Sequence, residues 1–109
     1  MRKFLMSTLA ISAIATSVNA GCYSTGCADV RIDKILITTR GDILVGTTGN
    51  ERSMACAATV GQYMTVPVNN PGKNALYSMF LTAKTTKAKV SMTIIKNTAG
   101  CKISYAYMK

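Results

Sequence analysis

The strongest constraint on the fold lies in residues 69–109, whose apolar pattern changes period once. Asn70-Pro71 supplies a capping side chain and a proline at the first helical position, and the β-branched pair Thr85-Thr86 ends the helical pattern. Between them, apolar residues recur at i, i+3, i+4 and i+7, the spacing of one buried helical face. These residues are Leu76, Met79, Phe80 and Ala83, and Tyr77 and Leu81 widen the face. We therefore predict one helix that starts at Asn70-Pro71 and ends near Thr86.

After this helix the period changes to two, which predicts a terminal hairpin of two strands. Apolar and polar residues alternate through Val90–Ile94, and Asn97–Gly100 has the composition of a turn. The second strand carries its apolar residues on one face, namely Cys101, Ile103, Tyr105 and Tyr107. We expect this face to be buried and the opposite face to be exposed to water.

Three more strands are predicted before the helix. Asp29–Thr39 is rich in β-branched residues, and its alternation slips by one near Asp33-Lys34. Such a slip indicates a bulge, or a strand shared between two faces of a barrel. Arg40-Gly41-Asp42 has the composition of a tight hairpin turn, and Ile43–Thr47 is the returning strand. Gln62–Val68 is the third strand, and it should end, or lie at a sheet edge, at Pro67, which has no N–H to donate.

Two further segments have weaker patterns. Residues 21–28 are small and polar, which predicts little regular structure in them. Residues 54–60 are compatible with a short strand or with a helical turn. The predicted order of elements is thus strand, strand, strand, helix, strand, strand.

The first twenty residues have the three parts of a signal peptide. Arg2 and Lys3 are followed by an apolar run from Phe4 to Ala15 and by the small-residue cleavage pattern Val18-Asn19-Ala20. We expect cleavage after Ala20, which leaves a single small domain over residues 21–109 in a secreted or periplasmic protein. No stretch reaches the ~20 apolar residues that a membrane span requires, so an integral membrane protein is not expected.

The cysteines predict a disulfide framework. All four, Cys22, Cys27, Cys56 and Cys101, follow the export signal, and an even number in an exported domain is typical of disulfides. Two bridges are expected, and three pairings are open. The spacing of Cys22 and Cys27 falls within the zinc-ligand range, but the chain has no histidine. We therefore predict no metal and no cofactor.

The charge is distributed unevenly. Removal of Arg2 and Lys3 lowers the formal net charge from +9 to +7, and every acid lies before residue 52. From Lys73 onward all charged residues are lysines. Such one-sided charge indicates an anionic partner, such as an acidic glycan, a phospholipid surface or an acidic protein face. The alternative is that these lysines only keep the protein soluble.

The predicted order of elements matches the OB-fold, a mainly β fold in which a helix lies between strands 3 and 4 of a five-stranded Greek-key barrel. Within it, Leu76–Ile95 resembles the segment of the Shiga toxin B subunit in which an apolar, alanine-containing helix runs into a Val-x-x-Thr-Ile strand. The chain is also similar to small exported bacterial proteins with a cysteine-containing first strand and a helix of this kind.

The toxin resemblance implies three further properties. Cys27 and Cys101 match the position of the family's one bridge, so a Cys27–Cys101 disulfide is implied. A homo-pentameric ring is implied, with helices around a central pore and an outer surface that binds cell-surface sugars. The family's sugar-binding residues cannot be carried over one by one, because the chain has no tryptophan and only Asp33 and Asp42 partly match the acids of the family's first hairpin.

Function is predicted to be binding without catalysis. With no histidine and four scattered acids, no base, nucleophile and orienting group can be assembled. Tyr105 and Tyr107, near lysines, could stack bases, but an exported protein seldom meets single-stranded nucleic acid, so no nucleic-acid partner is expected. These tyrosines are instead expected to pack against the helix with their hydroxyls outward.

We therefore predict an exported module that recognises cell-surface glycans as an oligomeric ring. The alternative is a monomeric or dimeric protein that binds another, acidic exported protein. Polar loop residues are the candidate ligand contacts: Arg40, Asp42, Asn50, Arg52, Asn97 and Lys102.

Overall fold

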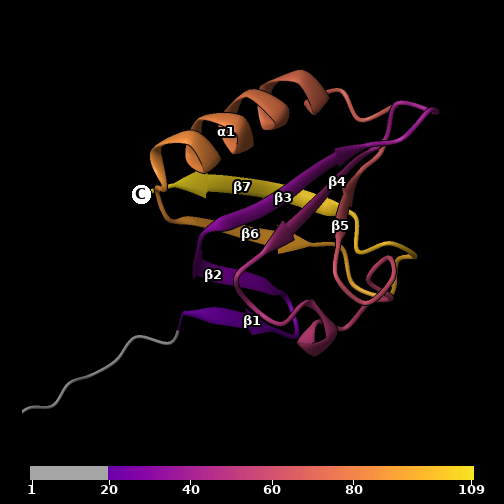
Figure 1. Cartoon of the computed structure of the whole chain (residues 1–109). Coiled ribbons are helices and arrows are strands. Elements are labelled where there is room, and N and C mark those ends of the chain that lie inside the picture. The colour runs from indigo at the N-terminus through magenta and orange to yellow at the C-terminus, as the bar shows by residue number, and fades with distance from the viewer. Residues whose placement is uncertain (1–19) are drawn as a thin grey trace, which may run out of the picture.

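The computed structural model describes residues 20–109, and the predicted signal peptide lies outside them except for its last residue. These residues form two antiparallel sheets and one long helix (Figure 1), which confirms a mainly β fold with a helix. One sheet has the strand order β1-β2-β6-β7 and the other β3-β4-β5. Residues 20–109 contain seven strands where five were predicted, and in this part of the chain the sheets do not form one closed barrel. The elements are β1 (Gly21–Tyr23), β2 (Gly26–Val30), β3 (Ile32–Ile37), β4 (Ile43–Thr47), the 3-10 turn η1 (Glu51–Ser53), β5 (Met64–Val66), α1 (Lys73–Thr86), β6 (Val90–Ile94) and β7 (Ile103–Met108).

The first predicted strand is divided between the two sheets. Val30 pairs with Val90 of β6, whereas Ile32 pairs with Thr47 of β4, so the chain crosses from one sheet to the other at Arg31. A register shift follows directly, between Ile32 and Lys34. The predicted slip is therefore confirmed, and it marks both a bulge and a strand shared between two sheets. The backbone at the crossing stays hydrogen-bonded, because the N–H of Thr48 donates to the carbonyl of Arg31 at 3.0 Å.

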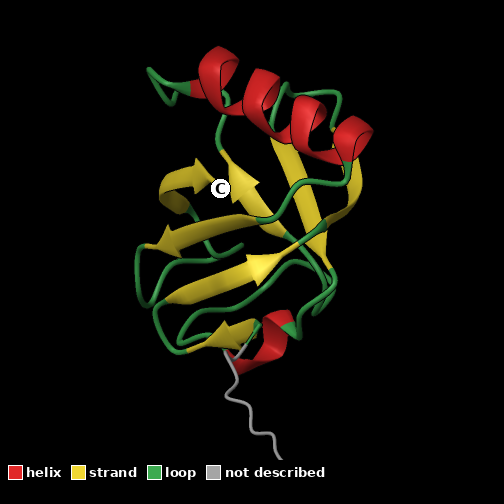
Figure 2. Cartoon of the chain, turned by 90° about the vertical axis from the view of Figure 1, so that its left-hand side faces the viewer, coloured by secondary structure: helices red, strands yellow, loops and turns green. Residues whose placement is uncertain are grey.

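Helix α1 covers one side of the core between the sheets and packs against β3 and β7 (Figure 2). Phe80 and Ala83 are fully buried, as predicted, and Leu76 and Tyr77 are partly buried against the core. Leu81, in contrast, is 45% exposed and does not widen the buried face. Among residues 20–109, no helix is both long enough and apolar enough to cross a membrane.

The helix begins later than predicted. Asn70 forms a turn of its own, because its Oδ1 accepts a hydrogen bond from the N–H of Gly72 at 2.7 Å, and its carbonyl accepts one from Lys73. Gly72 then occupies the N-cap position without a side-chain cap. The predicted end is confirmed at Thr86, and Lys87 follows with a left-handed φ of 59°.

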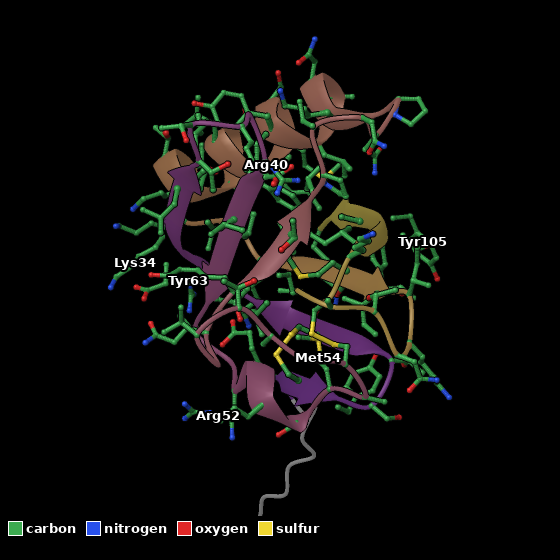
Figure 3. All side chains as sticks on the ribbon, turned by 90° about the vertical axis from the view of Figure 1, so that its right-hand side faces the viewer. Lys34, Arg40, Arg52, Met54, Tyr63 and Tyr105 are labelled. Carbon is green, nitrogen blue, oxygen red and sulfur yellow. A yellow bond between two sulfur atoms is a disulfide. The ribbon has the colours of Figure 1, made fainter. Side chains whose placement is uncertain are left out.

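The terminal hairpin corrects the predicted face of its second strand. Ile103 pairs with Ile94, but Tyr105 pairs with Thr93, so Ser104 is an extra residue in β7. Such a bulge moves every later side chain to the other face of the sheet. Ile103 is accordingly buried, whereas Tyr105 and Tyr107 are 57% and 53% exposed. The prediction that these tyrosines share the buried face was wrong, and Figure 3 shows Tyr105 pointing away from the core.

The cysteines form two disulfides, Cys22–Cys27 and Cys56–Cys101, which confirms two bridges and fits an oxidising, non-cytoplasmic compartment. The Cys27–Cys101 pairing implied by the toxin resemblance was wrong. Residues 21–28, predicted to be irregular, form the β1–β2 hairpin and set Cys22 directly opposite Cys27. Cys101 instead lies beside Cys56, with 5.2 Å between their Cα atoms.

Candidate functional site

A cleft of about 510 Å³ lies between the β3–β4 turn and the β6–β7 connection. Both segments lie on one side of the molecule, with β5 between them (Figure 1). The turn contributes Thr38, Arg40 and Asp42, and the connection contributes Gly100 and Lys102. The cleft therefore joins residues that lie some sixty positions apart in the sequence. The remaining lining residues are Leu44, Thr59, Thr65, Pro67, Val68, Asn69 and Ala99.

The turn that carries Arg40 is held in one conformation by its own hydrogen bonds. The N–H of Gly41 donates to the carbonyl of Thr38, and the N–H of Asp42 donates to the Thr38 hydroxyl, at 2.9 and 3.1 Å. Gly41 has a φ of +96°, which favours glycine. A Cβ at this position would also lie 2.9 Å from Cγ2 of Val68. This close approach fixes the turn against the segment that follows β5.

Asp42 ties the turn to that segment. Its Oδ1 accepts a hydrogen bond from the N–H of Val68 at 2.8 Å, and its Oδ2 lies 3.6 Å from Nη2 of Arg40. The Asp42 side chain is 17% exposed, whereas that of Arg40 is 79% exposed. An exposed pair of this length contributes little to stability. Asp42 is thus engaged with the protein, while the Arg40 guanidinium is accessible to a ligand.

The opposite wall is built around Gly100, which has a φ of +82°. A Cβ at this position would lie 2.8 Å from Oγ1 of Thr65 and 3.3 Å from Oγ1 of Thr59, so both hydroxyls are close to the wall. The wall is anchored from behind, because the N–H of Thr65 donates to the carbonyl of Cys101 at 3.1 Å. The Cys56–Cys101 bridge holds the same point covalently. Two hydroxyls and one glycine therefore form a rigid polar surface in the cleft.

The structure brings three of the six candidate residues together. Arg40, Asp42 and Lys102 line the cleft. Arg52 lies in η1, with Asn50 at the N-cap before it, and Figure 3 shows Arg52 at the far end of the molecule from Arg40. There the Oδ1 of Asn50 accepts a hydrogen bond from the N–H of Arg52, as a helix cap.

Asn97 does not line the cleft either. It is exposed, has a φ of 62°, and its N–H donates to the carbonyl of Ala55 at 2.8 Å. An asparagine tolerates this left-handed conformation better than most residues, so its role is to form the turn.

The sequence did not indicate the threonines of the cleft. Thr38, Thr59 and Thr65 lie in or beside strand-like segments, where a threonine also fits as an ordinary β-branched residue. Thr59 and Thr65 lie beside the segment that the Cys56–Cys101 bridge holds, and the sequence left that pairing open. Gly100 was expected only as part of the turn at Asn97–Gly100, so no local pattern indicated the threonine hydroxyls beside it.

Glu51 is a buried acid outside the cleft. It is 5% exposed, and its Oε2 accepts hydrogen bonds from both the N–H and the hydroxyl of Thr47. These bonds fasten η1 to the end of β4. Among residues 20–109, no three histidine, cysteine or acidic side chains gather closely enough to hold a metal ion.

A second exposed feature lies on the outer face of the four-stranded sheet. The strand registers place Tyr23, Gly26, Thr93 and Tyr105 in one row, because directly paired residues of antiparallel strands point to the same side. Tyr107 pairs with Ser91 in the next row on that side. All three tyrosines are at least half exposed. We call Tyr23, Tyr105 and Tyr107 the tyrosine face.

The chain matches no protein-family model, no curated protein and no solved structure. Functional proposals therefore rest on the fold, the cleft and the tyrosine face.

Proposed function

We propose that this protein is an exported, non-catalytic module that binds cell-surface glycans in the cleft. OB-folds bind oligosaccharides and oligonucleotides on the face of strands 2 and 3, between the loops that join strands 1–2 and 4–5. In chain order, the counterparts of these loops are the β3–β4 turn and the β6–β7 connection. Both line the cleft, and this coincidence is the observation that carries the proposal.

The pairing of the strands supports an OB-like arrangement. Together, β2 and β3 act as one bent first strand that pairs with β6 on one side and with β4 on the other. Between the two sheets, Thr65 of β5 forms a parallel bridge with Lys102, which lies just before β7. This is the strand contact that an OB barrel uses between its third and fifth strands.

The lining of the cleft suits a sugar. A sugar ring has apolar C–H faces and a rim of hydroxyls, so it needs both apolar walls and placed polar groups. Apolar walls are supplied by Leu44, Pro67 and Val68. Polar groups are supplied by the hydroxyls of Thr59 and Thr65. Export of the chain, proposed from its first twenty residues and consistent with its disulfides, would place the cleft where cell-surface glycans occur.

A glycan array tests this proposal. We expect selective binding that Arg40→Ala and Lys102→Ala each weaken, because both residues line the cleft. Arg52→Ala is the matched control, since it removes a cation at the far end of the molecule. Selective binding that depends on Arg52 and not on Arg40 would place the site elsewhere, and an array without any binding would contradict the glycan function.

We further propose that the module acts as an oligomeric ring, as the toxin resemblance implies. An apolar groove of about 380 Å³, lined by Leu76, Met79 and Tyr105, runs between the start of α1 and β7. Leu81 does not line this groove, but it is also exposed on the same helix, at 45%, and contact with another copy would cover such apolar surface. Light scattering on residues 21–109 should give a mass near five chains. A monomer at every salt concentration would contradict the ring.

The tyrosine face supports the second candidate function, binding of another exported protein. Tyrosine is enriched in protein interfaces, where its ring is buried and its hydroxyl stays hydrogen-bonded. Tyr105→Ser combined with Tyr107→Ser would abolish binding of such a partner and leave glycan binding in the cleft unchanged.

A further inference from the structure

The mouth of the cleft collects positive charge from three separate elements. Arg40 comes from the β3–β4 turn and Lys102 from the β6–β7 connection, and both line the cleft. Lys73, the first residue of α1, brings its amine to the same turn, 3.8 Å from the position of a Cβ on Gly41. Cations that are distant in the sequence are thus gathered at one opening.

The protein compensates this charge only in part. The two ion pairs among residues 20–109 are Arg40–Asp42 and Lys109–Asp29, so Lys73 and Lys102 have no acidic partner there. Asp42 also gives one of its oxygens to the N–H of Val68. Because Asp42 is the one acid among the lining residues, the cleft and its rim keep a net positive charge.

The helix adds to this field. The first turn of α1 contains no acid and holds Lys73, although the N-terminal end of a helix dipole is positive and favours anions. A lysine at this position is unfavourable for the isolated protein, and an anion bound nearby would relieve the repulsion. The charge, the helix end and the open Arg40 side chain therefore point to the same kind of ligand.

We propose that the cleft selects acidic saccharides, with the carboxylate or sulfate of the sugar held between Arg40 and Lys102. This inference rests on the proposed glycan function and names the class of glycan. The planar guanidinium of Arg40 offers paired N–H donors that match the oxygens of either anion. The hydroxyls of Thr59 and Thr65, which lie beside Gly100 in the wall that also carries Lys102, contact the ring hydroxyls of the same sugar.

The test compares each acidic glycan with its neutral counterpart. An array carrying such pairs is followed by calorimetry with lactose, 3′-sialyllactose and lactose 3′-sulfate, and with hyaluronan oligosaccharides before and after reduction of their carboxylates. We expect the acidic member of a pair to bind at least about 10-fold more tightly than the neutral one, as expected for a charge-assisted hydrogen bond. The sialylated and sulfated probes separate the carboxylate from the sulfate.

Three variants assign the selectivity to the cleft. Arg40→Gln and Lys102→Gln should each lower the affinity for the acidic member about 10-fold and leave that for the neutral member nearly unchanged. Lys87→Gln is the matched control, because Lys87 is an exposed cation at the other end of α1. Thermal unfolding of each variant checks that the fold is kept.

The outcomes distinguish a failure of this inference from a failure of the proposed glycan binding. Equal affinity for acidic and neutral members would overturn the inference and leave glycan binding in place. An equal loss of affinity in Lys87→Gln and Arg40→Gln would overturn it as well, because binding would then follow the overall charge of the protein. The absence of any saccharide binding would overturn both.

Discussion

Removal of the Cys56–Cys101 disulfide should destabilise the protein strongly. The bridge joins residues 45 positions apart and ties the wall of the cleft to the start of β7. In the chain-entropy model, a closed loop of that length restricts the unfolded chain by about 4 kcal/mol at 25 °C. The same model gives about 2 kcal/mol for Cys22–Cys27, which joins residues 5 positions apart. The two bridges of one molecule thus provide an internal comparison.

The assay is urea unfolding of two double variants, C56A/C101A and C22A/C27A, monitored by circular dichroism. With a slope of ~1–2 kcal/mol per molar urea for a domain of this size, a loss of about 4 kcal/mol lowers the midpoint by roughly 2–4 M. Because small domains have a total stability of only about 5–15 kcal/mol, C56A/C101A should keep its fold without denaturant but with a much smaller stability margin. C22A/C27A should keep its fold and lose about half as much stability.

Equal losses in the two double variants would refute this reasoning, because loop length would then not govern the effect. A small loss in C56A/C101A would show that the hydrogen bonds around Gly100 hold the wall without the bridge. Titration of the unfolded, unreduced protein checks the starting state, since it should detect no reactive thiol.

Three further predictions concern single side chains. Phe80→Ala should lower the unfolding free energy by roughly 3–5 kcal/mol because Phe80 is fully buried, whereas Leu81→Ala on the next position should change it little; equal effects in a denaturant titration would contradict the observed helix face. Gly100→Ala should cost stability and weaken glycan binding together, because a left-handed φ of +82° and a threonine hydroxyl 2.8 Å away both oppose a Cβ; an unchanged melting temperature would rule out that close approach. The Asp29 carboxylate accepts a hydrogen bond from the Lys109 amine at 2.9 Å and raises the pKa of Lys109 above its usual 10.5. The pair should therefore stabilise the fold at pH values below 10.5, and this stabilisation should be lost as the pH rises through the raised pKa. Side-chain NMR titration should show this pKa return to the usual value in Asp29→Asn, and a wild-type value at or below 10.5 would mean that the pair does not form in solution.

Local patterns were sufficient to predict much of the fold. Ile43–Thr47 was predicted to the residue, because a turn sequence precedes it and an apolar β-branched run fills it. The slip at Asp33-Lys34 was visible because a bulge inside one strand breaks its own alternation. In both cases the cause of the structure lies within a few residues of its position.

The features that the sequence did not indicate depend on distant parts of the chain. Ile103–Met108 alternates without a break, and only its pairing with β6 places the bulge at Ser104. The partner of each cysteine likewise follows from strand register, which brings Cys22 opposite Cys27. The same division holds for the cleft: loop polarity pointed to Arg40, Asp42 and Lys102, whereas the threonine wall required the tertiary fold.

The crossing of the chain from one sheet to the other at Arg31 also limits the order in which the two sheets can form during synthesis. Strands β3, β4 and β5 are neighbours in sequence as well as in space, so their sheet can pair early, and Cys22 can meet Cys27 across a short hairpin. In contrast, β2 must wait for β6, which is synthesised some sixty residues later. Cys101 arrives later still, directly before the last strand. The bond that holds the wall of the cleft therefore cannot form until nearly the whole chain has been synthesised, whereas the Cys22–Cys27 bond can form at the start.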